Sequence, residues 1–229
     1  MKRILAYGDS NTWGFLPIDF AVGKLERLPF SESWAGIASA QLAPDFEIVV
    51  DALPGRTLGV DRPDMATRGL PSHAWNGLAE LSAALIRNAP LDAIILALGT
   101  NDLLLEPEIS VEAYLERTQA LVTSVKAFKL PLPLIGMEAP MRVFVMAQHG
   151  FGETPTNPNG PQAEQKRALL VGALRAFSEN HQCGFIDAAE AVSTLGGDGV
   201  HLDRAAHRRL GGLIANTLEH FYHAGERAK

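Results

Sequence analysis

The chain is predicted to fold as a three-layer, doubly wound α/β domain with about five parallel strands, and two observations predict this class. Short apolar runs rich in β-branched residues alternate with longer stretches in which apolar residues recur every three or four positions. One run, residues 93–98, is apolar throughout and ends at Gly99, which is typical of a central strand covered on both faces.

The predicted strands share an apolar composition and stop at turn-forming residues. The first ends at Gly8, and the second contains Ile48-Val49-Val50. In chain order, the predicted strands span residues 3–7, 46–51, 93–98, 132–137 and 184–186.

The predicted helices carry apolar residues at helical spacing. They span residues 33–42, 78–88, 111–128, 161–181 and 204–223. Because strands and helices alternate and parallel crossovers are right-handed, helices should cover both faces of one sheet, as in flavodoxin-like folds.

The segment 139–161 interrupts this alternation. Its four prolines and three glycines lie among apolar residues. We interpret it as an irregular, partly ordered excursion over the functional site. Residues 1–229 are otherwise expected to form a single domain, since the chain can bury one substantial core and nothing in it indicates a second domain.

Composition excludes several classes of function. A net charge of −6 argues against nucleic acid as the main partner, and Cys183 is the only cysteine, so neither an intrachain disulfide nor a zinc site is expected. The apolar stretch 4–7 is too short for a signal peptide, and no run is long enough to span a membrane. A cytoplasmic location without membrane partners is therefore expected.

Three short polar segments are expected to carry the chemistry. Ser10, in Gly-Asp-Ser, follows the first strand, and Asn101, in Gly-Thr-Asn-Asp, follows the third. Ligands bind beyond the carboxyl ends of parallel strands, so both should face one site. A serine hydroxyl needs a base, and His201 is the best candidate because Asp198 lies three residues before it.

The same segments provide donors for an oxyanion. We expect the Ser10 and Gly55 backbone N–H groups and the Asn101 amide to bind the charge that develops on a tetrahedral intermediate. The alternatives are structural: Ser10 as a helix N-cap and Asn101 as a turn residue. Of the other histidines, His149 lies in the excursion and is a candidate for ligand contact, whereas His207 is expected to form an exposed pair with Asp203.

The chain resembles the SGNH, or GDSL-type, hydrolase superfamily, whose four blocks correspond here to Ser10, Gly55, Asn101 and His201, with Asp198 in the position of the triad acid. The opening, Lys-Arg-Ile-Leu-Ala-Tyr-Gly-Asp-Ser-Asn-Thr-Trp-Gly, is similar to the bacterial arylesterase and acyltransferase branch. The chain has asparagine at position 11, where the family name has leucine, and this change is expected to leave the triad unaffected.

The resemblance implies an SGNH hydrolase fold and a cofactor-free, metal-free serine esterase acting on small short-chain or aryl esters, with acyl transfer to alcohols or peroxide in some members and assembly as a homo-oligomer. It also implies a substrate pocket shaped by Trp13, Val200, Phe144 and Phe151. A deacetylase of acetylated sugars or an acyl-thioesterase could use the same residues. A different class, a flavodoxin-like module that binds a phosphorylated ligand, would leave Asp198 and His201 unexplained.

Overall fold

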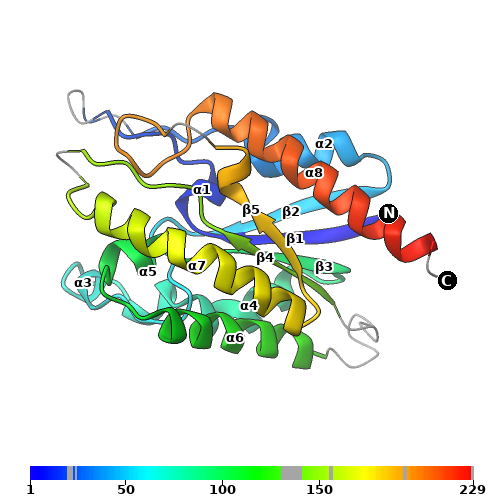
Figure 1. Ribbon diagram of the computed structural model, residues 1–229, viewed down its shortest axis with the longest axis horizontal. Coiled ribbons are helices and arrows are strands. Elements are labelled where there is room, and N and C mark those ends of the chain that lie inside the picture. Colours follow the sequence, from blue (N-terminus) through cyan, green and yellow to red (C-terminus); the bar gives the residue numbers. More distant parts are fainter. Residues whose placement is uncertain (20–22, 24, 130–140, 155–156, 193–194, 228–229) are drawn as a thin grey trace.

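The computed structural model describes residues 1–19, 23, 25–129, 141–154, 157–192 and 195–227 (Figure 1). Its five strands form one parallel sheet in the order β2-β1-β3-β4-β5. They are β1 (Lys2–Gly8), β2 (Phe46–Ala52), β3 (Ala93–Ala97), β4 (Arg142–Ala147) and β5 (Gly184–Asp187). In this order β1 lies between β2 and β3. The strand order of a doubly wound sheet reverses at such a position.

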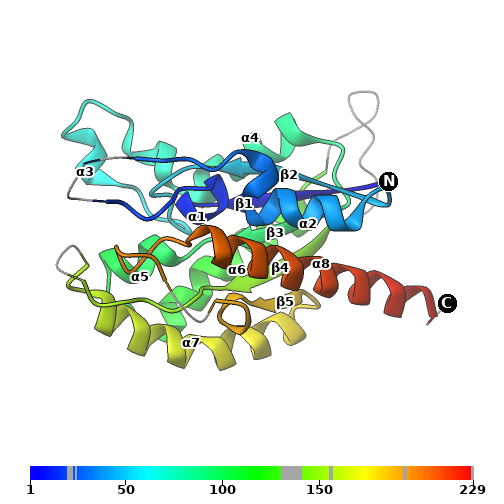
Figure 2. The same cartoon turned by 90° about the horizontal axis from the view of Figure 1, so that it is seen from above.

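Helices cover both faces of the sheet, as the alternation predicts. The α-helices of the described residues are α1 (Ser10–Trp13), α2 (Trp34–Leu42), α3 (Pro63–Ala66), α4 (Gly77–Asn88), α5 (Thr100–Leu105), α6 (Val111–Ala127), α7 (Gly160–Asn180) and α8 (Arg204–Arg227). Three short 3-10 turns lie at Phe30–Glu32, Ser72–Trp75 and Ala188–Glu190. Helices α2 and α8 pack together on one face, and α4, α6 and α7 cover the other (Figures 1 and 2).

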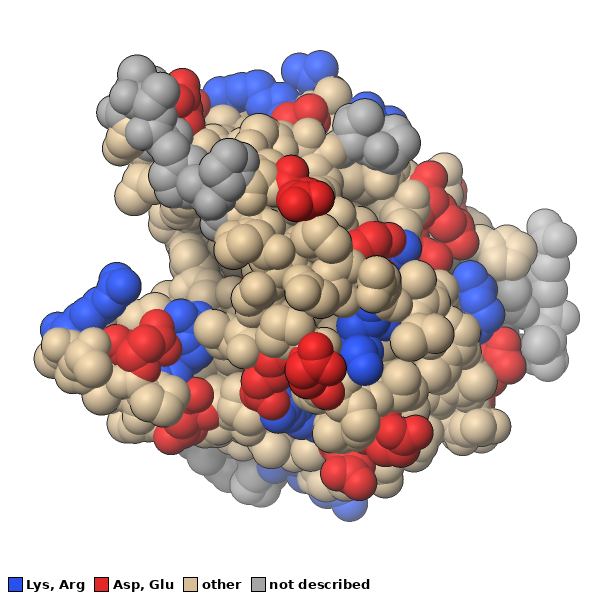
Figure 3. All heavy atoms as spheres, turned by 60° about the vertical axis from the view of Figure 1, so that its left-hand side comes forward, with Lys and Arg blue, Asp and Glu red and all other residues tan. Residues whose placement is uncertain are grey.

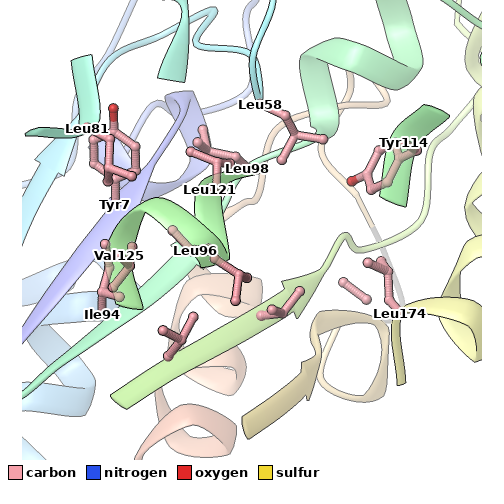
Figure 4. Close-up of a cluster of buried hydrophobic side chains, with 14 of the residues drawn as sticks. Tyr7, Leu58, Leu81, Ile94, Leu96, Leu98, Tyr114, Leu121, Val125 and Leu174 are labelled. Carbon is pink, nitrogen blue, oxygen red and sulfur yellow. The ribbon is translucent and has the colours of Figure 1, made fainter. Parts of the chain in front are cut away.

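The strands divide the core into two layers because successive side chains point to opposite faces. Leu5 of β1 and Ile94 of β3 face α4 and α6. Figure 4 labels Ile94 among other side chains of the same buried cluster. The chain neighbours of these two residues, Ile4 and Ile95, face α2 and α8. All four side chains are fully buried, and each contributes roughly 1.5–3 kcal/mol to folding through the hydrophobic effect.

Polar side chains determine where three of the covering helices begin. Ser33 accepts a hydrogen bond from the Gly36 N–H at the start of α2, Asn76 caps α4, and Ser110 caps α6. Such caps satisfy backbone donors that have no partner within the helix and are each worth about 1 kcal/mol. Among the described residues, none of the helices is long and apolar enough to cross a membrane.

The strand that follows β3 in the sheet was not among those predicted. The predicted strand at 132–137 lies within 130–140, outside the described residues, and the place beside β3 is taken by β4, Arg142–Ala147. This strand falls inside the segment 139–161 that was predicted to be irregular, and α7 also begins within it. Both 132–137 and 142–147 are short apolar runs, and periodicity alone cannot decide between them. Only the part from 148 to 159 is irregular where it is described.

The other four strands and the five main helices are confirmed, with ends that differ by no more than four residues from those predicted. The carboxyl ends of β1, β2 and β3 therefore meet at one edge of the sheet, and the segments that follow them lie side by side there (Figure 1).

Candidate active site

The polar segments predicted to carry the chemistry converge at this edge. Ser10 is the first residue of α1, directly after β1; Gly55 lies in the loop after β2; and Asn101 lies in the first turn of α5, after β3. All three line one cavity, together with Asp198 and His201 from the loop before α8. Figure 3, which brings this end of the molecule forward, shows the surface hollowed there.

Ser10, His201 and Asp198 form a continuous hydrogen-bonded chain. His201 Nε2 lies 3.0 Å from Ser10 Oγ, and His201 Nδ1 lies 2.6 Å from Asp198 Oδ2. Because a carboxylate can only accept, Nδ1 carries the proton and Nε2 is free to accept the serine hydrogen. The imidazole is thus in the tautomer that a general base requires.

Asp198 is held by four hydrogen bonds. Its Oδ1 accepts from the Val200 and His201 N–H groups at 3.0 and 2.9 Å, and its Oδ2 accepts from the Ile18 N–H at 2.8 Å as well as from the His201 ring. Burial opposes the charge, but the His201 hydrogen bond and its attraction outweigh burial and hold the pKa of Asp198 well below its usual range. The carboxylate therefore stays ionised and oriented toward the imidazole.

N–H groups with no acceptor among the described residues lie beside Ser10, where the sequence predicts donors for an oxyanion. Within the described part of the chain, the backbone N–H groups of Ser10 and Gly55 have no acceptor. The Asn101 amide donates one hydrogen to the Arg56 carbonyl at 2.9 Å, which leaves its second N–H for the cavity. Gly55 has φ +88°, a conformation that side-chain-bearing residues rarely adopt, and this explains why glycine is required there.

Buried charges support the loops that carry these donors. The Asp102 carboxylate accepts from the Leu58 N–H at 2.9 Å and from Arg117 at 3.0 Å, and so ties α5 to the loop after β2. Asp9 caps α1 through the Asn11 N–H, and burial raises the pKa of its carboxyl to about 6. Asp9 and Asp102 thus bond loop backbone and do not line the cavity.

The cavity has a volume of about 320 Å³ and a mainly apolar wall. Of the predicted pocket residues, only Val200 lines it. Phe144 is fully buried in β4 against α8, because the segment expected to be an excursion is a strand. Trp13 lines a separate cavity with the Arg27 guanidinium 4.0 Å from its ring centre, and Phe151 lines a third cavity beside Glu164.

Sequence reasoning missed half of the residues that line the cavity. The residues concerned are Phe15, Ile18, Pro54, Arg62, Met65 and Leu104. Three of them, Pro54, Arg62 and Met65, lie on the connection between β2 and α4, which runs from 53 to 76. Connections of that length are uncommon in compact domains unless they are functional, so the length itself was a usable signal.

The Phe15 ring packs against the His201 ring. Its ring centre lies 4.8 Å from that of His201. The Arg62 guanidinium is paired with Asp64 at 2.7 Å and also donates to the Gly55 carbonyl at 3.0 Å. Arg62 therefore braces the loop that carries the Gly55 donor.

The expectation that His207 forms an exposed pair with Asp203 was wrong. His207 is fully buried, and its Nδ1 accepts from the Trp34 N–H at 3.2 Å instead of pairing with Asp203 at the surface. Asn11 is also buried, and its side chain contacts the loop of His201. His149, a candidate for ligand contact, is only 2% exposed and does not line the cavity.

Comparison with known proteins agrees with this geometry. The model of the GDSL-like lipase/acylhydrolase family matches residues 6–209. The native aryl esterase of M. smegmatis superposes with a TM-score of 0.83 and 30% sequence identity, over 96% of this chain and 99% of that chain. Est24, a carbohydrate acetylesterase from Sinorhizobium meliloti, gives a TM-score of 0.83 and 27% identity over 96% and 100%. Comparison with curated protein sequences gives no match.

The family match covers most of the chain, and the structural matches cover nearly all of it. The five-stranded parallel sheet matches the fold of these solved structures. The chain therefore belongs to the GDSL-like lipase/acylhydrolase family, within the SGNH superfamily, and is a carboxylic ester hydrolase.

Proposed function

We propose that the protein hydrolyses short-chain or aryl carboxylic esters through an acyl-enzyme on Ser10. The hydrogen-bonded chain from Asp198 through His201 to Ser10, beside a small cavity, carries this proposal. A serine hydroxyl is a weak nucleophile until a positioned base takes its proton, and His201 Nε2 is 3.0 Å away.

In the first half of the reaction, Ser10 Oγ attacks the ester carbonyl while His201 Nε2 takes the hydroxyl proton. Asp198 stabilises the imidazolium that forms. The carbonyl oxygen becomes an oxyanion, which the Ser10 and Gly55 N–H groups and the Asn101 amide bind. His201 then gives its proton to the leaving alkoxide, and the C–O bond breaks to leave an acyl-serine and an alcohol.

In the second half, His201 takes a proton from water, and the resulting hydroxide attacks the acyl carbonyl. The same donors bind the second oxyanion. Its collapse breaks the bond to Ser10 Oγ, which recovers its proton from His201, and the carboxylic acid leaves. The ester and one water supply all the atoms of the two products, and His201 carries the proton in each half.

The cavity wall favours a small, apolar substrate. At about 320 Å³ the cavity is at the lower end of the range for small-molecule sites, and Phe15, Met65 and Leu104 make its wall apolar. These features support short acyl groups and aryl or alkyl alcohols.

The test measures the hydrolysis of p-nitrophenyl acetate, butanoate and octanoate by the wild-type protein and by Ser10→Ala. We expect kcat/KM to fall with chain length, and kcat of the variant to be lower by several orders of magnitude. Equal turnover of octanoate and acetate would contradict the proposed substrate size. Unchanged turnover in Ser10→Ala would remove the serine from the mechanism.

Deacetylation of sugars is the second candidate, because Est24, at 27% identity, is a carbohydrate acetylesterase. The same triad would release acetate from a sugar hydroxyl. An acetylated xyloside and phenyl acetate, assayed side by side, separate the two. A higher kcat/KM for the xyloside than for phenyl acetate would favour sugar deacetylation. The apolar wall of the cavity instead supports an aryl ester as the substrate.

Acyl transfer and self-association belong to the same proposal. We expect an added alcohol to compete with water for the acyl-enzyme, so that ethanol with an aryl acetate yields ethyl acetate. We also expect a homo-oligomer, which light scattering coupled to gel filtration would detect as a mass above 24.6 kDa.

A further inference from the structure

The side chain of Asn11 joins the helix of the nucleophile to the loop of the base. Asn11 Oδ1 accepts a hydrogen bond from the Leu202 N–H at 3.0 Å, and Asn11 Nδ2 donates to the Val200 carbonyl at 3.4 Å. These two groups belong to the peptide units on either side of His201. Asn11 is only 6% exposed, so water competes little for either contact.

His149 determines which way the Asn11 amide faces. His149 Nδ1 donates to the Gly150 carbonyl at 2.7 Å, so its Nε2 carries no proton and accepts from Asn11 Nδ2 at 3.0 Å. Burial lowers the pKa of His149 to about 4, which keeps the ring neutral and its Nε2 an acceptor. With Nδ2 directed at His149, Asn11 Oδ1 must face the Leu202 N–H.

The peptide groups around His201 are all bonded. The His201 N–H donates to Asp198 Oδ1 at 2.9 Å, and the His201 carbonyl accepts from the Gly196 N–H at 3.1 Å. Asn11 binds the other two, the Val200 carbonyl and the Leu202 N–H. The Asn11 side chain therefore holds half of the backbone polar groups that orient the imidazole.

We propose that Asn11 is a positioning residue for the His201 base and that His149 acts through Asn11 to hold it in place. This inference rests on the proposed function, in which His201 takes the proton of Ser10. Because Asn11 follows Ser10 directly on α1, its contacts couple the position of the base to that of the nucleophile. An apolar side chain would fill the same space without that coupling and would leave two buried peptide groups unpaired.

The test uses Asn11→Leu, His149→Leu, the double variant and His149→Gln, whose amide oxygen can replace Nε2 as acceptor. His207→Asn is the matched control, because His207 is also buried and accepts from a backbone N–H, but that N–H belongs to Trp34 of α2 and not to the loop of His201. For each variant, kcat and KM for p-nitrophenyl acetate, the rate of phosphonylation by a fluorophosphonate, and Tm are measured.

We expect Asn11→Leu to lower kcat and the phosphonylation rate about ten- to a hundredfold, with KM within twofold, because a small misplacement of a catalytic group has effects of that size. His149→Leu should lower both rates less, and Gln at 149 should restore most of that loss. In the double variant, the loss should match that of Asn11→Leu alone, since His149 acts only through Asn11. The control should lose stability and keep its kcat.

Wild-type kcat in Asn11→Leu, or losses that multiply in the double variant, would overturn the proposal. A kcat loss in His207→Asn equal to that in Asn11→Leu would assign the effect to stability. If Asn11→Leu does not fold, the comparison of His149→Leu with His149→Gln decides the question. Equal kcat values and phosphonylation rates in these two variants would overturn the proposal. Failure of the proposed function has a separate signature, because Ser10 of the wild-type protein would then not react with the fluorophosphonate at all.

Discussion

Ser10 Oγ and His201 Nε2 lie 3.0 Å apart although 191 positions separate them in the chain. The first residue follows β1, and the second precedes α8, so the contact exists only because both segments reach the same edge of the sheet. The Asp198 carboxylate completes the arrangement from the other side of the imidazole at 2.6 Å.

Replacing Asp198 with asparagine should lower kcat by roughly 10³–10⁴ with little change in KM. The amide keeps the shape of the carboxylate but neither favours the Nδ1–H tautomer of His201 nor stabilises its imidazolium. Steady-state kinetics on p-nitrophenyl acetate measure this loss. A decrease of less than tenfold would show that His201 does not depend on the carboxylate.

Removing the Asn101 amide should lower kcat by roughly 10²–10³, the size typical for one oxyanion donor. Asn101→Ala is compared with Asn88→Ala, whose amide bonds Asp51 and the Ala84 carbonyl outside the cavity. The control should keep the wild-type kcat. Similar kcat values in the two variants would show that Asn101 serves only to bond the Arg56 carbonyl.

Enlarging the cavity should shift the acyl-chain preference. Leu104 lines the cavity, whereas its neighbour Leu105 is 46% exposed and does not. We expect Leu104→Ala to raise the ratio of kcat/KM for p-nitrophenyl octanoate to that for the acetate by about tenfold, since one or two methylenes of space are worth that much. Leu105→Ala should leave the ratio unchanged. Equal ratios in both variants would place the acyl group elsewhere.

The stability of the fold should fall as the pH drops below about 6.5, in part through His207. Burial lowers the pKa of His207 to about 4 in the folded chain, against about 6.5 when unfolded, so the unfolded chain binds the proton more readily between these values. The native state therefore keeps its full stability above pH 6.5 and loses about 2 kcal/mol through this group by pH 5.

Urea unfolding of the wild-type protein and His207→Asn at pH 7.5, 6 and 5 measures that contribution. Asparagine can still accept from the Trp34 N–H but does not titrate. The comparison also cancels Asp9, whose raised pKa stabilises the native state as the pH falls. The free energy of unfolding of the wild-type protein should fall more steeply toward pH 5 than that of the variant. Parallel curves would contradict the role of His207.

The sequence predicts the fold class and the catalytic candidates because each depends on local pattern. Ser10, Asn101 and His201 each sit in a short motif next to a strand or helix end, and strand order brings those ends together. The strand at 142–147 was not predicted because two apolar runs lie close together in the chain, and only pairing with β3 identifies 142–147 as a strand.

The contacts of Asn11 could not be predicted for a different reason. Its partners His149 and Val200 lie 138 and 189 positions away, and nothing in the residues around position 11 indicates them. The same holds for His207, where spacing suggested an ion pair with Asp203 but packing of α8 against α2 buries the ring. Tertiary packing determined the role of these polar residues.

Intact mass after treatment with a fluorophosphonate shows directly whether Ser10 is an activated nucleophile. We expect one adduct on the wild-type protein and none on Ser10→Ala, with His201→Ala reacting at least a hundredfold more slowly. An adduct that persists in Ser10→Ala would place the nucleophile elsewhere. A folded wild-type protein that forms no adduct would show that His201 does not activate Ser10.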